Sequence, residues 1–190
     1  ADVAVIALGE DCFQSGEGRS QTDISMKGLQ NELLKEIYSV NKNVVVVLMN
    51  GRPLQINWMA DNVPVIVEAW HLGSEAGNAI ADVLFGDYNP AGKLPVSFPR
   101  DVGQLPLYYN HLSTGRPSGV GVFWSHYTDE LNEPLFPFGY GLSYTSFEYS
   151  NLQLSNDLLE QNGQITVSAN VTNTGDRAGE EVVQLYIRDL

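Results

Sequence analysis

Short runs of apolar, β-branched residues alternate with helical patterns through the first half of the chain. The apolar runs cover residues 3–8, 44–49 and 63–67, and the helical patterns cover residues 26–40 and 75–85. Alternation of this kind is typical of an α/β domain, and uninterrupted apolar runs favour parallel strands buried on both faces by crossover helices. We therefore predict an α/β domain built on a mainly parallel sheet with flanking helices.

The two helical patterns carry more detailed signals. In the first, Leu29, Leu33, Ile37 and Val40 recur at helical spacing, which predicts that these four side chains form one buried stripe. The first helix should therefore contact the sheet through this stripe.

The second helical pattern has signals at both of its ends. Ser74 is a suitable N-cap with Glu75 in the first turn, Ile80 and Leu84 share a face, and Gly86 stands where a terminating glycine belongs. These signals predict a helix that begins after Ser74 and ends before Gly86.

The second half of the chain has a different pattern. Periodicity fades over residues 86–141, where frequent prolines break any long element, and the density of aromatic residues favours a packed loop region. Alternating apolar residues then predict a half-buried strand over 164–171, a polar turn over 172–176 and another strand over 182–187. The sequence ends after about three strands at most, which are too few for two packed sheets, so this second domain is expected to be an incomplete β-sandwich.

Composition and charge exclude several classes of function. The chain of 190 residues has 23 acidic and 10 basic residues, a formal net charge of −13, which disfavours a nucleic-acid partner. Its apolar runs fall short of the roughly 20 residues that span a bilayer, so no membrane association is expected. It starts inside an apolar run without Met or a signal peptide, so we expect that its natural start is missing.

No metal site or cofactor is predicted. Cys12 is the one cysteine, and His71, His111 and His126 are scattered singly, without the spacing of a metal site. The dinucleotide fingerprint fails because Gln21 stands where the third glycine is needed. A nucleophile elbow over residues 141–145 also fails, because its closing glycine is absent.

The loop over residues 9–24 is the chemically suggestive segment. Ligands of an open parallel sheet bind beyond the carboxyl ends of its strands, which is where this loop emerges. Glu17 lies between two glycines, which allow the backbone to bring a carboxylate close to a substrate, whereas Glu10 follows the strand directly. From chemistry alone, a loop glutamate is more often a solvated side chain than a functional one.

Several strings that span nearly the whole chain add a second line of inference. They are residues 9–10 with 15–17 and 20–23, residues 48–53, residues 68–95, residues 103–111, and residues 136–145. In their order and spacing they resemble glycoside hydrolase family 3, particularly the bacterial periplasmic β-glucosidases. The resemblance implies three consecutive domains: a barrel with an aspartate nucleophile, an α/β sandwich, and a fibronectin type III-like β-sandwich.

On this resemblance, residues 1–145 are expected to be the C-terminal α/β domain of the family, an αβα sandwich that is truncated at its N-terminal side. Residues 146–190 are expected to begin the fibronectin type III-like domain. The motif in which the family's acid/base glutamate precedes Ser-Arg-Thr-Asp falls on Glu17 rather than Glu10. Gln21 departs from this motif, where many relatives have Arg, and Arg19 is the candidate to supply a guanidinium in its place.

The function that the resemblance implies is part of a retaining, exo-acting β-glucosidase that hydrolyses terminal β-D-glucosyl residues. Its partners would be a β-glucoside or related oligosaccharide and the missing N-terminal barrel domain, and its location would be periplasmic or secreted. The fragment alone is expected to be inactive. A β-xylosidase and a non-catalytic carbohydrate-binding or scaffolding module remain alternatives, and the substrate-binding residues and the sugar are not identified by the sequence.

Overall fold

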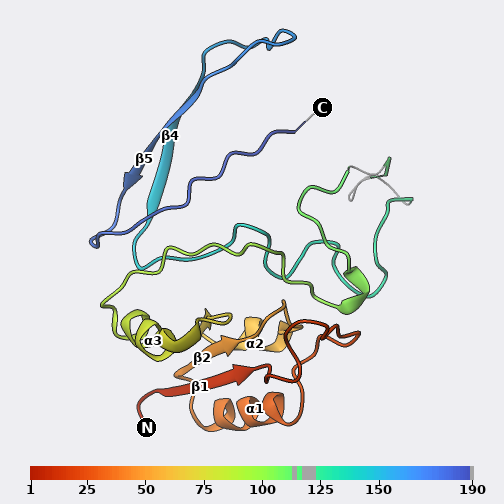
Figure 1. The fold of residues 1–190 in the computed structure, drawn as a ribbon, viewed down its shortest axis with the longest axis vertical. Coiled ribbons are helices and arrows are strands. Elements are labelled where there is room, and N and C mark those ends of the chain that lie inside the picture. The colour runs from red at the N-terminus through yellow and green to blue at the C-terminus, as the bar shows by residue number, and fades with distance from the viewer. Residues whose placement is uncertain (113–114, 117–122, 189–190) are drawn as a thin grey trace. The chain divides into compact units, whose positions relative to one another are not determined.

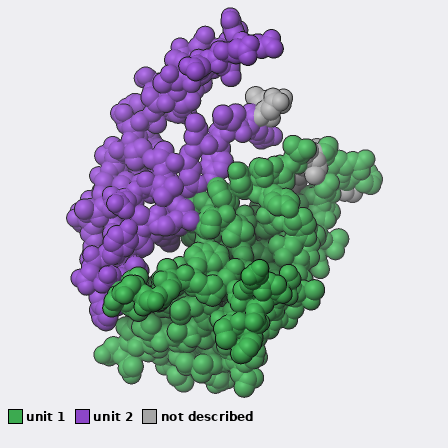
Figure 2. All heavy atoms as spheres, viewed as in Figure 1, with its two compact units in different colours: residues 1–80, 94–140 green, residues 81–93, 141–190 purple. Residues whose placement is uncertain are grey.

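The computed structural model of this chain describes residues 1–112, 115–116 and 123–188. The chain divides into two compact units (Figure 2). Unit 1 contains residues 1–80 and 94–140, and unit 2 contains residues 81–93 and 141–190. Each unit is described below by itself.

Unit 1 is built on a three-stranded parallel sheet. Its strands are β1 (Ala4–Gly9), β2 (Val44–Met49) and β3 (Val65–Glu68), in the spatial order β1-β2-β3. All three coincide with, or overlap, the predicted apolar runs, and all pairings are parallel. The predicted α/β class with a parallel sheet is therefore confirmed.

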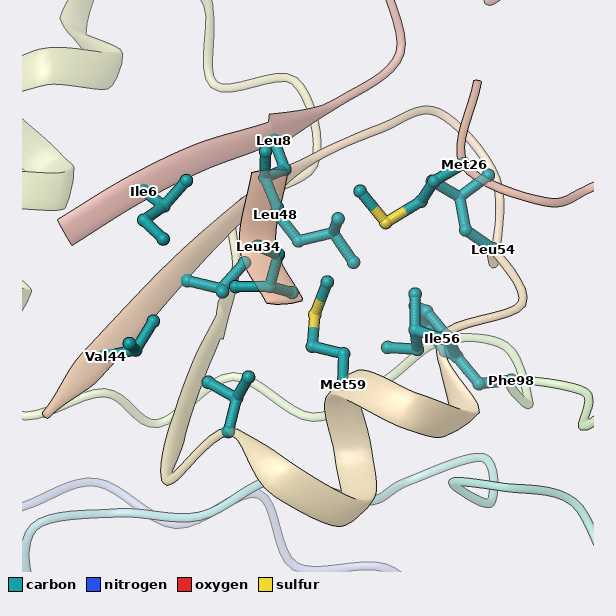
Figure 3. Packing of buried hydrophobic residues seen from close by; sticks show 12 residues of the cluster. Ile6, Leu8, Met26, Leu34, Val44, Leu48, Leu54, Ile56, Met59 and Phe98 are labelled. Atoms are coloured by element: carbon teal, nitrogen blue, oxygen red, sulfur yellow. The ribbon is translucent and has the colours of Figure 1, made fainter. Parts of the chain in front are cut away.

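Two helices connect these strands. Helix α1 (Gln30–Val40) follows β1 and lies beside the sheet, and the short α2 (Asn57–Asn62), which the sequence did not predict, connects β2 to β3 (Figure 1). Side chains from the strands and both helices meet in one apolar core, in which Leu34 of α1 and Met59 of α2 are almost completely buried (Figure 3).

The predicted stripe on α1 is wrong. Leu29, Leu33 and Val40 are exposed and Ile37 is half-buried, whereas the buried residue of the helix is Leu34. The helix is oriented by Leu34 and Ile37 in the core and by Gln30, whose amide bonds both the N–H and the carbonyl of Gly9. Spacing alone could not choose between two overlapping apolar stripes, because only contact with the sheet distinguishes them.

The strands differ in how far they are buried. Along β1, Ile6 and Leu8 are buried and Val5 and Ala7 are exposed, whereas every residue of β2 is buried or half-buried. Burial on both faces is therefore confirmed for β2 but not for β1, whose second face has no covering layer in the described residues.

The second predicted helix is α3 (Ala76–Phe85), and the division between the units falls within it. Ser74 is not its N-cap: it lies inside the 3₁₀ turn η1 (Gly73–Glu75), which has no side-chain cap. The predicted end is correct, since Gly86 follows the helix with φ of +80°, a conformation that glycine adopts easily.

The described part of residues 86–141 is loop-rich, as predicted. It contains the 3₁₀ turn η2 (Val102–Gln104) and a single bridge between Phe98 and Phe136. The buried amide of Gln104 holds this region together, because it accepts a hydrogen bond from the Arg100 N–H at 2.6 Å and donates one to the Leu131 carbonyl at 2.8 Å.

Unit 2 contains an antiparallel pair of strands, β4 (Phe147–Leu154) and β5 (Val167–Asn173). The predicted strand over 164–171 overlaps β5, while β4 was not predicted. The predicted strand over 182–187 is wrong, because these residues pair with no strand in the described structure. A strand needs the hydrogen bonds of a neighbouring strand, which an alternating sequence does not guarantee. The predicted boundary between residues 145 and 146 stays a prediction.

No helix within the described residues has the length and apolar character needed to cross a membrane.

Candidate functional site

Three loops leave the carboxyl ends of β1, β2 and β3 at the same edge of the sheet. Because the strands are parallel, these loops emerge side by side, which is where an open α/β sheet places its ligand site. The loop after β1 starts with a close approach of two strands: a Cβ at Gly9 would collide with the Met49 carbonyl, so only glycine fits there.

The loop after β1 presents Glu17 at the corner of a tight turn. The Arg19 N–H donates to the Gly16 carbonyl at 3.1 Å, and Gly18 has φ of +71°, the geometry of a turn that needs glycine at its third position. Glu17 is exposed, and among the described residues its carboxylate has no hydrogen-bond or ion-pair partner. The glycines on either side therefore present a free carboxylate. That Glu17 is catalytic stays a prediction at this point.

Glu10, the other glutamate of the loop, is bonded through both of its carboxylate oxygens to the loop after β2. One of its oxygens accepts from Arg52 Nε at 2.8 Å and the other accepts from the Gly51 N–H at 3.0 Å. Its side chain is only 5% exposed. Glu10 is therefore a structural anchor that joins the first two loops.

Arg52 is a residue of this site that the sequence reasoning missed. Its guanidinium donates to the carbonyls of Gln14 at 2.6 Å and Arg19 at 2.8 Å, which flank Glu17 in the sequence. The sequence signal for Arg52 was weak. It lies within residues 48–53, one of the segments that resemble the family, but nothing in the sequence indicated that it reaches the loop after β1.

The departure from the family motif at Gln21 is accommodated inside the same loop. Gln21 Nε2 donates to the Gln14 carbonyl at 3.0 Å. Arg19, the predicted substitute, donates to the Phe13 carbonyl at 2.9 Å, and its guanidinium lies over the Phe13 ring. Both side chains therefore stabilise the loop, while Arg52 binds the same Gln14 carbonyl from outside it.

The loop after β3 reaches the other two through His71. Its Nε2 lies 3.3 Å from Ser15 Oγ, and a Cβ at Gly51 would collide with that hydroxyl and touch the imidazole. Ser15, Gly51 and His71 come from three different loops, so their contact fixes the loops relative to one another at the base of the Glu17 turn.

The end of β3 carries a buried carboxyl group, that of Glu68. Burial raises the pKa of Glu68 to about 7, an effect only partly offset by hydrogen bonds from the Trp70 N–H and the Asn50 side chain. Asn50 itself is fully buried, and its amide donates to the Arg52 carbonyl at 2.7 Å. Glu68 Oε2 and Asn50 Oδ1 are buried acceptors without a partner in the described structure.

The described residues contain no group of three His, Cys, Asp or Glu side chains that could hold a metal ion. His111 and His126 each lie beside a carbonyl of their own loop, and Cys12 is exposed. Of the three histidines, His71 alone belongs to the site described above.

Comparison with known proteins identifies the family to which this fold belongs. Residues 1–144 match the model of the glycosyl hydrolase family 3 C-terminal domain. The periplasmic β-glucosidase of Salmonella typhimurium is 49% identical, with 100% of this chain and 25% of the relative covered. A β-xylosidase of Formosa agariphila is 48% identical, with 100% of this chain and 26% of the relative covered.

Solved structures give the same result. The crystal structure of a β-glucosidase from Listeria innocua aligns with a TM-score of 0.89 and 42% identity, and covers 94% of this chain and 25% of that protein. The chain thus spans about a quarter of the length of the relatives it matches. With a family model that matches most of its residues, this chain belongs to glycoside hydrolase family 3.

Proposed function

We propose that this chain is the part of a retaining, exo-acting β-glucosidase that supplies the general acid/base, and that Glu17 is that residue. The observation that carries the proposal is the free carboxylate of Glu17 at a glycine-flanked turn, beyond the carboxyl end of a parallel sheet. The names of the relatives, most of them β-glucosidases, support the reaction class.

The contrast between the two loop glutamates supports the choice of Glu17. An acid/base catalyst must exchange protons with the glycosidic oxygen and with water, so its carboxyl group must be accessible. Glu10 is buried and has both oxygens bonded to Arg52 and Gly51, whereas Glu17 is exposed and unpartnered among the described residues. Glu10 is therefore unsuited to proton transfer.

The proposed chemistry uses two carboxyl groups about 5–5.5 Å apart. One attacks the anomeric carbon, while the other protonates the departing oxygen and later activates water. We assign the second role to Glu17. The first role belongs, by the family resemblance, to an aspartate of a barrel domain, and we therefore expect the 190-residue chain by itself to be inactive.

The choice of sugar has less support in the comparisons than the choice of reaction. The identity to the β-xylosidase of Formosa agariphila, 48%, nearly equals the 49% to the periplasmic β-glucosidase of Salmonella typhimurium. This region of the sequence therefore hardly separates the two activities. Aryl β-glucosides and aryl β-xylosides should be assayed in parallel, and we expect the larger kcat/KM on the glucosides.

The first prediction concerns Glu17→Ala in the longer protein that contains this chain. Turnover of aryl β-glucosides with poor leaving groups should fall by about 10²- to 10⁴-fold, because their oxygen must be protonated as the bond breaks. Substrates with good leaving groups should lose less in this first step. Added azide should restore part of the turnover of the activated substrates, since it needs no general base to attack the intermediate.

Glu36→Ala is a matched control, because Glu36 is an exposed carboxylate in the middle of α1. It should leave the rates on both kinds of substrate unchanged. If Glu17→Ala hydrolyses the poor substrates at the parent rate, the assignment is wrong. If the parent protein binds oligosaccharides but cleaves none, the non-catalytic module is the correct reading.

A further inference from the structure

Arg52 holds the Glu17 turn from both of its sides. Its guanidinium NH2 group donates to the Gln14 carbonyl at 2.6 Å, before the turn, and to the Arg19 carbonyl at 2.8 Å, after it. We propose that Arg52, fixed in place by Glu10, is a positioning residue that sets where the Glu17 carboxylate lies in the active site. This inference rests on the proposed function of Glu17.

Glu10 determines where the guanidinium of Arg52 lies. It accepts from Arg52 Nε at 2.8 Å through one oxygen and from the Gly51 N–H at 3.0 Å through the other. Its own N–H donates to the Met49 carbonyl at the end of β2. Because Glu10 directly follows β1 and is bonded to β2 and its loop, the guanidinium is held against the rigid edge of the sheet.

The geometry requires an arginine. The planar guanidinium donates to a carboxylate through Nε and to two carbonyls through NH2, and its donors point in fixed directions. A lysine ammonium is a single point of charge and cannot reach the same three acceptors from one side chain in this arrangement. Hydrogen bonds from a charged donor are also stronger than neutral ones. Arg52 therefore carries more of the loop's stability than the neutral Gln21.

The hydrogen bonds of Arg52 matter because they restrain the two ends of a short segment that contains two glycines. Between Gln14 and Arg19 lie Gly16 and Gly18, both with positive φ, so the segment has few conformational restraints of its own. A displacement of the carboxylate by about 1 Å is enough to lower a catalytic rate by roughly 10²-fold. Loss of Arg52 should therefore weaken proton transfer by Glu17, although Arg52 need not touch the substrate.

The test uses Arg52→Ala in the longer protein, alone and combined with Glu17→Ala. Alone, it should lower kcat on substrates with poor leaving groups by about 10- to 100-fold, with less effect on activated substrates and little on KM. Added guanidinium chloride should restore part of the loss. In the Glu17→Ala background the same substitution should have no further effect, because its influence acts through Glu17.

Two further variants serve as a conservative substitution and as a matched control. Arg52→Lys retains a positive charge if the alanine variant folds poorly, and should show an intermediate, leaving-group-dependent loss. Arg100→Ala is the matched control, since Arg100 is similarly exposed, with 23% of its side chain accessible against 21% for Arg52, and donates to the Glu133 carbonyl. It should leave the leaving-group dependence unchanged.

The outcomes separate this inference from the proposed function. If Arg52→Ala lowers all rates equally, and by the same factor without Glu17, then Arg52 has only a general structural role and the inference is wrong. If Glu17→Ala itself shows no leaving-group dependence, the proposed function fails. A clear effect of Glu17→Ala with none of Arg52→Ala overturns the positioning role alone.

Discussion

The parallel sheet of unit 1 and the antiparallel pair of unit 2 differ in how apolar their strands are and in how they are stabilised. All of the buried hydrophobic side chains in the described structure belong to unit 1, whereas Leu152, Leu154, Val167 and Val171 of the pair β4–β5 are exposed. Uninterrupted apolar strands therefore pack into a core in unit 1, whereas the mixed apolar and polar strands of unit 2 have no buried hydrophobic side chain in the described residues.

Unit 2 depends instead on polar contacts near the base of its strands. Asn89 accepts hydrogen bonds from Ser143 Oγ at 2.8 Å and the Tyr144 N–H at 2.7 Å, and it donates to the Ala178 carbonyl at 2.9 Å. Nearby, Lys93 forms an ion pair with Glu181 at 3.3 Å. Each such contact contributes little net free energy, so unit 2 should be the less stable of the two.

The largest expected effect comes from truncating a leucine in the core of unit 1. Leu34→Ala removes a fully buried side chain between α1 and the sheet and should lower the free energy of unfolding by about 2–5 kcal/mol. Leu152→Ala in β4 is the matched variant, since Leu152 is 72% exposed. Urea denaturation of the 190-residue chain measures both. Equal losses would contradict the contrast between the units.

Next in size is the pH dependence that Glu68 gives to unit 1. Its folded pKa of about 7 lies above the ordinary value of 4.5, so the folded carboxyl keeps its proton while the unfolded one ionises. The resulting stabilisation is complete below pH 4.5 and is lost as pH rises to about 7, by up to roughly 3 kcal/mol.

Glu68→Gln should flatten this dependence and make unit 1 more stable than the parent chain at pH 8. Denaturant unfolding at pH 5 and pH 8 measures the effect. The control is Glu148→Gln in β4, where the carboxylate is exposed and the slope should stay as in the parent. If the unfolding free energy of the Glu68 variant changes with pH as much as that of the parent chain, a different group binds the proton.

The smallest change in stability is expected when the hydrogen bonds of Asn89 in unit 2 are removed. Asn89→Ala removes three hydrogen bonds and should destabilise that unit by about 1–2 kcal/mol. Amide hydrogen exchange should then increase in β4 and β5 but not in β1 and β2. Asn156→Ala, which removes one exposed hydrogen bond to the Leu158 N–H, should change little. Faster exchange throughout unit 1 would mean that the two units unfold together.

Local features of the sequence were sufficient to predict several elements. The apolar run at 44–49 predicted β2 with its bounds, Gly86 marked the end of α3, and the glycines around Glu17 indicated a loop that could bring a carboxylate close to a substrate. Each of these depends on neighbouring residues only: burial demands apolar side chains, and positive φ favours glycine.

The tertiary structure decided the features that depend on distant residues. Leu34 rather than Leu33 faces the core because the sheet and Gln30 orient α1, and residues 182–187 form no strand because no neighbouring strand pairs with them in the described residues. The roles of Glu10 and Arg52 were equally hidden, since these residues lie 42 positions apart in the sequence and the parallel pairing of β1 with β2 brings their loops together. The sequence therefore determined which residues prefer strand, helix and turn, while long-range packing decided which carboxylate is anchored and which is free.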